Sequence, residues 1–438
     1  MTMSAGTETL PAPPALPPVI ETMGPRGFQP VGPAERIETL DVLRGFALFG
    51  ILMVNMELFG WPIYQMFTGT RAGTTGPDLI VDWLVRFLMQ GKFYLLFSFL
   101  FGLGAAVQFA RAQERGVRSG CFFCRRLLVL LGIGLAHAFL IWEGDILVCY
   151  ALCGFLLLAF RNCKPRTILI WAAIFSLIPL LFYTGIWLLI TLASLVPESA
   201  KPIREEFARQ NAAFASLAEK DIHVFSQGTV AEIFGARARN VFFSWQCLFA
   251  YAPAVVGMFL VGLYAGKRRL LHQPEAHIRL VGRTLFWGLL VGLPTGVAYA
   301  IASGSSNTFA VNLRFWAGMS ALSVSGPALC LAYIAVFALW LRHDGWKRRL
   351  RPLAAAGQMG LTNYLLQSLV CTFLFYSYGL GWYGSVARAS SAGLALLIFA
   401  AQLPLSMWWL KRFRFGPAEW LWRSLTYRKP QPMRLVEI

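Results

Sequence analysis

The stretch RRLLVLLGIGLAHAFLIWEGDILVCYALCG, residues 125–154, organises the chain. Two apolar runs flank a turn that carries Glu143 and Asp145, and neither run contains a Lys or an Arg. This pattern predicts a helical hairpin inside a membrane. The first arm carries His137, the only one of the five histidines that falls inside a hydrophobic span. Ionisable groups at membrane depth are costly, so by default they mark a site that faces a bundle interior or a wet cavity.

The composition defines the broad class. Of the 438 residues, 57% are hydrophobic and only 14% are charged, which is typical of a polytopic membrane protein and not of a soluble fold. The net charge of +18 lies in short loops between apolar spans, where it orients helices, so we expect no nucleic-acid partner. Most of the eight cysteines lie in apolar runs, and Cys121 and Cys124 form a single C-x-x-C without a second pair. We therefore expect no metal site.

Ten membrane spans are expected, in an all-α fold. The second span has two alternatives, because Asp78, Asp82, Arg86 and Gln90 recur every four residues on one helical face. Either the part before Lys92 lies in the membrane interface and the span begins near Lys92, or one long helix exposes a face of polar residues to water. The other spans are 40–60, 127–142, 146–160, 168–196, 244–266, 280–303, 315–341, 353–378 and 393–410.

Basic loops alternate along the chain with loops poor in Lys and Arg, which predicts that both termini are cytoplasmic. The pattern EEFARQNAAFASLAEKDIHVF predicts an amphipathic helix over the outer mouth of the bundle. The expected organisation is a disordered Pro-rich tail (1–34), a first membrane half (35–196), an extracytoplasmic loop (197–240), a second membrane half (241–410) and a cytoplasmic C-terminal tail (411–438).

Polar residues mark the inner end of the first span. Asp41 and Arg44 lie three residues apart, close enough on one helix face to pair. Arg44 either extends to the interface with Asp41 as its neutralising partner, or holds a phosphate or carboxylate. Gly45 allows another helix to approach closely, and Asn55 lies in the outer half, where a single amide usually bonds to a neighbouring helix.

The hairpin offers a second polar group. His137 either bonds to a neighbouring helix and does nothing else, or acts as a general base or nucleophile. A carboxylate from the acidic turn could fix its tautomer. Asp145 begins the next helix, so a plain N-terminal cap is the alternative role for that carboxylate.

Three further polar residues lie in apolar surroundings. Lys92 starts the second span after Gly91, where aromatic and cationic anchoring at the interface explains it. Asn363 and Gln367 share a face of an apolar helix, so they either bond to neighbouring helices or line a cavity. The tail RFGPAEWLWRSLTY predicts a short helix on the membrane surface, with Glu419 and Arg423 paired at four-residue spacing.

Five ordered motifs resemble the bacterial YeiB-like membrane proteins, a family with a domain of unknown function. They are RIETLDVLRGFALFGILMVN, GKFYLLFSFLFGLG, the hairpin stretch, GQMGLTNYLLQS and RFGPAEWLWRSLTY. The family is grouped by fold with transmembrane acyltransferases, including the lysosomal heparan glucosaminide N-acetyltransferase and membrane O-acyltransferases that modify bacterial polysaccharides. The resemblance therefore implies a multi-pass protein of the bacterial inner membrane that moves an acyl group from cytoplasmic acyl-CoA to an acceptor reached from the other face.

The motif of the first span can be followed residue by residue. The LD-x-LRG signature falls on residues 40–45, and the Asn that ends the motif falls on Asn55. The heparan-type enzyme places its active histidine in the loop after this span, but residues 56–91 of this chain contain no His. His137 is therefore the intramembrane candidate for that role.

The resulting hypothesis is an acyl-CoA-dependent membrane acyltransferase. The candidate catalytic residues are His137 as general base or transient acyl carrier, Asp145 as the group that orients it, and Asp41. The candidate substrate-binding residues are Arg44, for the CoA phosphates, together with Asn55, Glu143, Lys92, Asn363 and Gln367. We expect no bound cofactor; acyl-CoA is the co-substrate, and the acceptor is a glycan, a lipid or a secondary metabolite.

A transporter or exporter of a small molecule or lipid is the alternative function, with the same polar residues forming a permeation path. Such a protein would need no CoA and would tolerate loss of a proton-transferring His. A haem or quinone electron carrier is weaker, because a single intramembrane His cannot supply paired axial ligands.

Overall fold

A computed structural model describes residues 38–65, 74, 76–114, 116, 119–272, 274–304 and 313–435 of the chain. The expected Pro-rich tail at 1–34 lies outside these residues. All regular secondary structure in the described part is helical. A single isolated β-bridge joins Phe413 and Arg434 near the C-terminus. The predicted all-α class is therefore confirmed.

Eight helical segments of the described residues are long and apolar enough to cross a membrane, and two shorter apolar helices accompany them. The eight are α1 (Glu38–Gly60), α3 with α4 (Pro77–Leu88 and Phe93–Glu114), α5 with the π-helix η2 (Ser119–Ala136 and His137–Ile141), α7 (Pro165–Ser194), α9 (Val230–Lys267), α10 (Ile278–Gly304), α11 (Leu313–Trp340) and α14 (Arg388–Leu410). The shorter two are α6 (Leu147–Phe160) and α13 (Gly360–Phe375). The chain is thus a multi-pass membrane protein.

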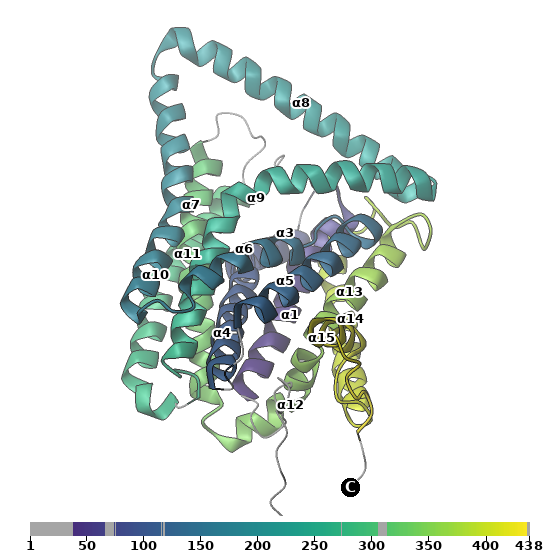
Figure 1. Ribbon diagram of the computed structural model, residues 1–438. Helices are drawn as coiled ribbons and strands as arrows, with labels where there is room; N and C mark the ends of the chain where they lie inside the picture. The colour runs from purple at the N-terminus through teal and green to yellow at the C-terminus, as the bar shows by residue number, and fades with distance from the viewer. Residues whose placement is uncertain are drawn as a thin grey trace, which may run out of the picture.

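The remaining helices lie at the two ends of the bundle. Figure 1 shows α8 (Pro197–Gln227) crossing one end beyond the membrane helices and α12 (Asp344–Gln358) at the other end, while α15 (Pro417–Tyr427) packs against α5 and α13. The amphipathic helix expected after the fifth span is therefore present as α8. A second helix begins within the expected segment 197–240, because a capping box between Thr229 and Glu232 starts α9 at Val230.

The second span is broken into two helices. α3 ends at Leu88 and α4 begins at Phe93, with Gly91 between them at a φ of 81°, a left-handed conformation that favours glycine. On α3 the Arg86 Nε donates to Asp82 Oδ2 at 2.7 Å. Of the two alternatives, one continuous long helix is therefore wrong, and a separate helix begins near Lys92; the position of α3 in the membrane interface stays a prediction.

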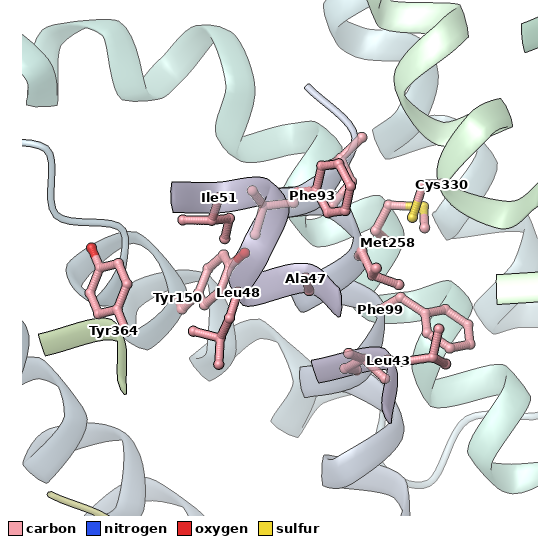
Figure 2. Packing of buried hydrophobic residues seen from close by; sticks show 14 of the residues in the cluster. Leu43, Ala47, Leu48, Ile51, Phe93, Phe99, Tyr150, Met258, Cys330 and Tyr364 are labelled. Atoms are coloured by element: carbon pink, nitrogen blue, oxygen red, sulfur yellow. The ribbon is translucent and has the colours of Figure 1, made fainter. Parts of the chain in front are cut away.

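The hydrophobic core surrounds α1, as Figure 2 shows for Leu43, Ala47 and Leu48. Gly45 lies so close to α12 that an added Cβ would stand 2.0 Å from the Leu353 carbonyl oxygen. The expected close helix approach at this glycine is therefore confirmed.

The expected single span at 353–378 is wrong. The helix breaks at Met359, whose ψ of 34° leaves the helical range, and the chain continues as the separate helix α13. The Asn363 Nδ2 donates to the Ala356 carbonyl at 3.0 Å, so a side chain satisfies a carbonyl beside the break. That compensation allows a helix end inside the bundle.

Candidate active site

The first arm of the hairpin ends in an unusual turn. After Ala136, α5 widens into the π-helix η2, which the Trp142 N–H closes by donating to the His137 carbonyl at 2.9 Å. Arg237, a buried residue of α9, donates to the Leu140 carbonyl at 2.9 Å and satisfies the end of this turn. Single π turns within α-helices occur frequently at functional sites.

A chain of hydrogen bonds begins at this turn. The His137 Nδ1 lies 2.8 Å from Asp145 Oδ2, and its Nε2 lies 2.9 Å from the hydroxyl oxygen of Ser368 on α13. The other oxygen of Asp145 accepts the Val148 N–H at 2.8 Å. The two roles expected for Asp145 therefore coexist, because one oxygen caps α6 while the other contacts the imidazole.

The protonation pattern follows from the chemistry of these groups. An ionised Asp145 is an acceptor only, so Nδ1 of His137 carries the ring proton of the neutral imidazole. Nε2 then accepts from the Ser368 hydroxyl, whose oxygen also lies 3.3 Å from the Tyr364 carbonyl. Hydroxyl, imidazole and carboxylate in this order have the geometry by which a Ser-His-Asp triad activates its serine.

A cavity of about 210 Å³ lies next to these residues, because Tyr364, whose ring contacts that of His137, is part of its wall. The wall also includes three arginines, Arg44, Arg126 and Arg423. The other lining side chains are mainly apolar and include Ile51, Phe97, Leu100, Phe101, Leu130, Leu147 and Tyr150. A wall that combines cationic and apolar side chains suits a molecule with an anionic head and a hydrocarbon part.

The arginines of the cavity are held by neighbours. Arg44 pairs with Asp41 at 2.9 Å, as the sequence predicted. The Arg126 guanidinium lies 3.7 Å from the ring centre of Trp422, which leaves the planar donor edge available. Both arginines line the cavity wall, so both can reach an anion inside it.

Two aromatic side chains flank the imidazole. The ring of Tyr364 lies 5.1 Å from His137 on the cavity side, and the ring of Trp142 lies 6.3 Å away. The Tyr364 hydroxyl and the Trp142 Nε1 are both buried, and neither donates a hydrogen bond to another described residue. Figure 2 shows Tyr364 and Tyr150, two of the aromatic residues of the cavity wall.

A second polar cluster lies beside the hairpin turn. The Tyr376 hydroxyl donates to Glu143 Oε2 at 3.1 Å, and the Arg237 guanidinium lies 5.6 Å from the Tyr376 ring centre. On α8, burial raises the pKa of Asp221 to about 6, while Asn240 donates to its carboxylate at 2.8 Å. Glu143 is therefore a buried acceptor in an internal cluster.

Two candidate residues have a structural role instead. The Asn363 Nδ2 bonds to Ser406 of α14 at 3.0 Å, and the Gln367 Nε2 bonds to Gln402 of the same helix at 2.8 Å. Neither amide lines the cavity. Of the two alternatives for these amides, bonding to a neighbouring helix is the one observed, since their donors join α13 to α14; their substrate-binding role stays a prediction.

Lys92 also differs from expectation. The side chain is fully buried, donates to the Arg86 carbonyl at 3.2 Å and lies 5.5 Å from the Tyr299 ring centre. It is therefore not an interface anchor and does not reach the cavity. Asn55 is half-buried and absent from the cavity wall, and Asp41 contacts Arg44 rather than His137.

Some residues of the site were missed in the sequence. Ser368 lies in a motif that was noted for its amides, and Tyr364 lies one turn before it. Arg237 falls in a segment expected to be a loop. Glu419, expected on the surface, is buried and accepts the Leu361 N–H at 2.6 Å, so α15 caps α13 and lines the cavity. These residues lie on α13, α9 and α15, and only the packing of these helices in the folded chain brings them together.

The described residues contain no group of three or more His, Cys, Asp or Glu side chains that could hold a metal ion. Fold and site together define a multi-pass helical membrane protein with a buried Ser-His-Asp arrangement beside a cavity whose wall includes three arginines.

The chain belongs to the family described as protein of unknown function DUF418, whose model matches residues 265–429. It is 36% identical over 421 residues to the uncharacterized protein YxaH of Bacillus subtilis (strain 168), covering 93% of this chain and 98% of the relative. An uncharacterized 39.9 kDa protein encoded in the amylase 3′ region of Bacillus acidopullulyticus is 30% identical over 414 residues, 93% of this chain and 99% of the relative. YeiB of Escherichia coli (strain K12) is 28% identical over 409 residues, 91% of this chain and 98% of the relative. The resemblance to YeiB-like proteins is thus confirmed.

Proposed function

We propose that this protein transfers an acyl group from a phosphate-bearing acyl thioester, such as acyl-CoA, to an acceptor at the membrane or its outer face. The supporting observation is the contact of His137 with Asp145 and Ser368 next to a cavity whose wall includes three arginines. A carboxylate-oriented imidazole is suited to moving protons during acyl transfer.

The chemistry of the cavity favours such a donor. Arg126 and Arg44 offer planar donors that match phosphate oxygens, and the apolar part of the wall suits an acyl chain. Tyr364 lines the same cavity, and its ring lies 5.1 Å from that of His137. A donor bound with its phosphates at the arginines would therefore direct its thioester towards His137.

The orientation of the chain supports a cytoplasmic donor. Arg44 and Arg126 belong to the helix ends that the distribution of basic residues assigns to the cytoplasm. With the short helices α6 and α13 taken as spans the total is ten, and we propose that both termini lie on that side, in the inner membrane of a bacterium. Glu143 and Tyr376 would then face the acceptor side.

The test is acyl-CoA binding and thioester cleavage by the purified full-length protein in nanodiscs. Arg126→Ala should weaken binding of acetyl-CoA by about 10- to 100-fold, the loss of one charge-assisted hydrogen bond to phosphate. Arg412→Ala is the matched control, because Arg412 stacks on Trp408 in the same way but does not line the cavity. His137→Ala should retain binding and lose CoA release.

Two results would decide against this function. Absence of saturable binding by the wild type, for acetyl-CoA and for longer acyl-CoAs, would remove the donor. Binding without any CoA release, together with transport of a small amphiphile that survives in His137→Ala, would favour the transporter alternative.

A further inference from the structure

The hydroxyl of Ser368 has an environment unlike that of other buried serines. Ser98 bonds to the Tyr94 carbonyl at 2.8 Å and to the Tyr150 phenol, and Ser406 accepts from an amide. Ser368, which is fully buried, lies 2.9 Å from an imidazole nitrogen. A structural serine on a helix needs only the carbonyl one turn before it, so this second contact calls for another explanation.

The geometry assigns Ser368 the donor role in this contact. The carboxylate of Asp145 holds the ring proton on Nδ1 of His137, which leaves Nε2 as the acceptor for the serine proton. Removal of that proton makes the serine oxygen nucleophilic, and this is how an adjacent base activates an otherwise weak nucleophile.

The same contact argues against His137 as the acyl carrier. An acyl-imidazole would have to form on Nε2, because Nδ1 is occupied by Asp145. Nε2 faces the hydroxyl of Ser368 at 2.9 Å, so the atom best placed to meet an incoming carbonyl is the serine oxygen.

Tyr364 is the residue of the cavity wall nearest to Ser368 along α13. The two residues lie one turn apart, about 6 Å along the helix axis. Tyr364 lines the cavity and its ring contacts His137, whereas Ser368 lies outside the cavity wall. A donor in the cavity would therefore reach Ser368 by a shift of the Tyr364 ring.

We propose that Ser368 is a nucleophile that carries the acyl group as an ester, so that transfer takes two steps; this rests on the acyl-transfer function proposed above. In the first step the serine oxygen attacks the thioester carbonyl, its proton passes to His137 Nε2, and the carbon–sulfur bond breaks. The thiolate leaves with that proton as a free thiol. In the second step an acceptor hydroxyl or amine gives its proton to Nε2 and attacks the ester, and the proton returns to the serine oxygen.

The polar atoms around the imidazole fit this sequence. A tetrahedral intermediate carries negative charge on the former carbonyl oxygen and needs hydrogen-bond donors close by. The Tyr364 hydroxyl and the Trp142 Nε1 are buried donors that donate to no other residue in the described part of the chain, and both rings flank His137. They are the donors available for that oxygen.

The first experiment treats the full-length protein in nanodiscs with an alkyl fluorophosphonate, which phosphonylates activated serines without requiring any acyl donor. Peptide mass spectrometry should find the adduct on Ser368 of the wild type, a result that does not depend on the folding of a variant. His137→Ala should slow labelling by about 100-fold or more, the contribution of a general base. Ser98→Ala, the matched buried serine, should label like the wild type.

The second experiment supplies acetyl-CoA without acceptor and measures the mass of the intact protein. One acetyl group on Ser368, removed on adding an acceptor or at alkaline pH, would support the ester. Fluorophosphonate labelling of Ser368 without acetylation would support the nucleophile and contradict the CoA donor instead. Absence of labelling at Ser368 would overturn the proposed ester. Acyl-CoA turnover by Ser368→Ala at the wild-type rate would also overturn it, but would still support the proposed acyl transfer.

Discussion

Replacing Asp145 by Asn is expected to abolish the reactivity of Ser368 while leaving the fold almost unchanged. The amide oxygen can still accept the Val148 N–H at the start of α6, which now bonds to the carboxylate at 2.8 Å. The amide nitrogen must then face Nδ1 of His137, because the reverse orientation would set two donors against each other at Val148. Nδ1 becomes an acceptor, and the ring proton moves to Nε2.

The magnitude follows from this change of tautomer. With a proton on Nε2, His137 can no longer take the proton of Ser368, whose oxygen lies 2.9 Å away. The equivalent substitution lowers the turnover of a serine protease by about 10⁴-fold, which corresponds to about 5 kcal/mol of activation free energy. The cap is retained, so the free energy of unfolding should change by less than about 1 kcal/mol.

The assay is the rate of fluorophosphonate labelling in nanodiscs, followed together with the apparent melting temperature. Asp78→Asn is the matched control, because Asp78 caps α14 by accepting the Ala389 N–H at 2.7 Å and contacts no imidazole in the described residues. The reasoning is refuted if Asp145→Asn, folded and as stable as the wild type, labels within about threefold of the wild-type rate.

Two further predictions concern stability. Burial raises the pKa of Asp221 from 3.8 to about 6, so the folded state binds a proton at this carboxyl more tightly than the unfolded state does. Protonation of Asp221 therefore stabilises the fold fully below about pH 4, and this stabilisation is lost as the pH rises through 6. Protease resistance of α8 should therefore fall over that interval in the wild type and change less in Asp221→Asn; equal profiles would contradict the role of this carboxyl. Gly45→Ala should destabilise the protein by about 3 kcal/mol, because its Cβ would stand 2.0 Å from the backbone oxygen of Leu353, which cannot move like a side chain. Gly132→Ala, with no atom within 4 Å of its Cβ, should leave the melting temperature unchanged or higher, and equal losses in both variants would contradict the packing argument.

Local sequence patterns do not predict helix ends that lie inside the bundle. The segment at 353–378 is apolar enough to predict one span, but the chain breaks at Met359 because Asn363 and α15 supply partners for the backbone groups that the break exposes. The acidic cap of α13, Glu419, comes from more than fifty residues further along the chain. No periodicity within the span could have indicated it.

The sequence by itself determined the membrane class, the hairpin and the presence of a histidine within it. Apolar runs of bilayer length cannot remain in water, and an ionisable group within one of them needs partners, so these features are local and can be read from spacing. The pairing of Asp41 with Arg44 and the close approach at Gly45 are likewise local or set by residue size.

Only the tertiary structure decided which polar residues meet. Ser368 lies 231 positions from His137, and a serine in an apolar helix looks the same whether it bonds to its own carbonyl or to an imidazole. The converse holds for Asn363 and Gln367, whose amides are taken up by α14. Hydrogen bonds in a bundle are satisfied by whichever helices lie adjacent, and that adjacency is fixed by packing over the whole chain rather than by any one stretch of it.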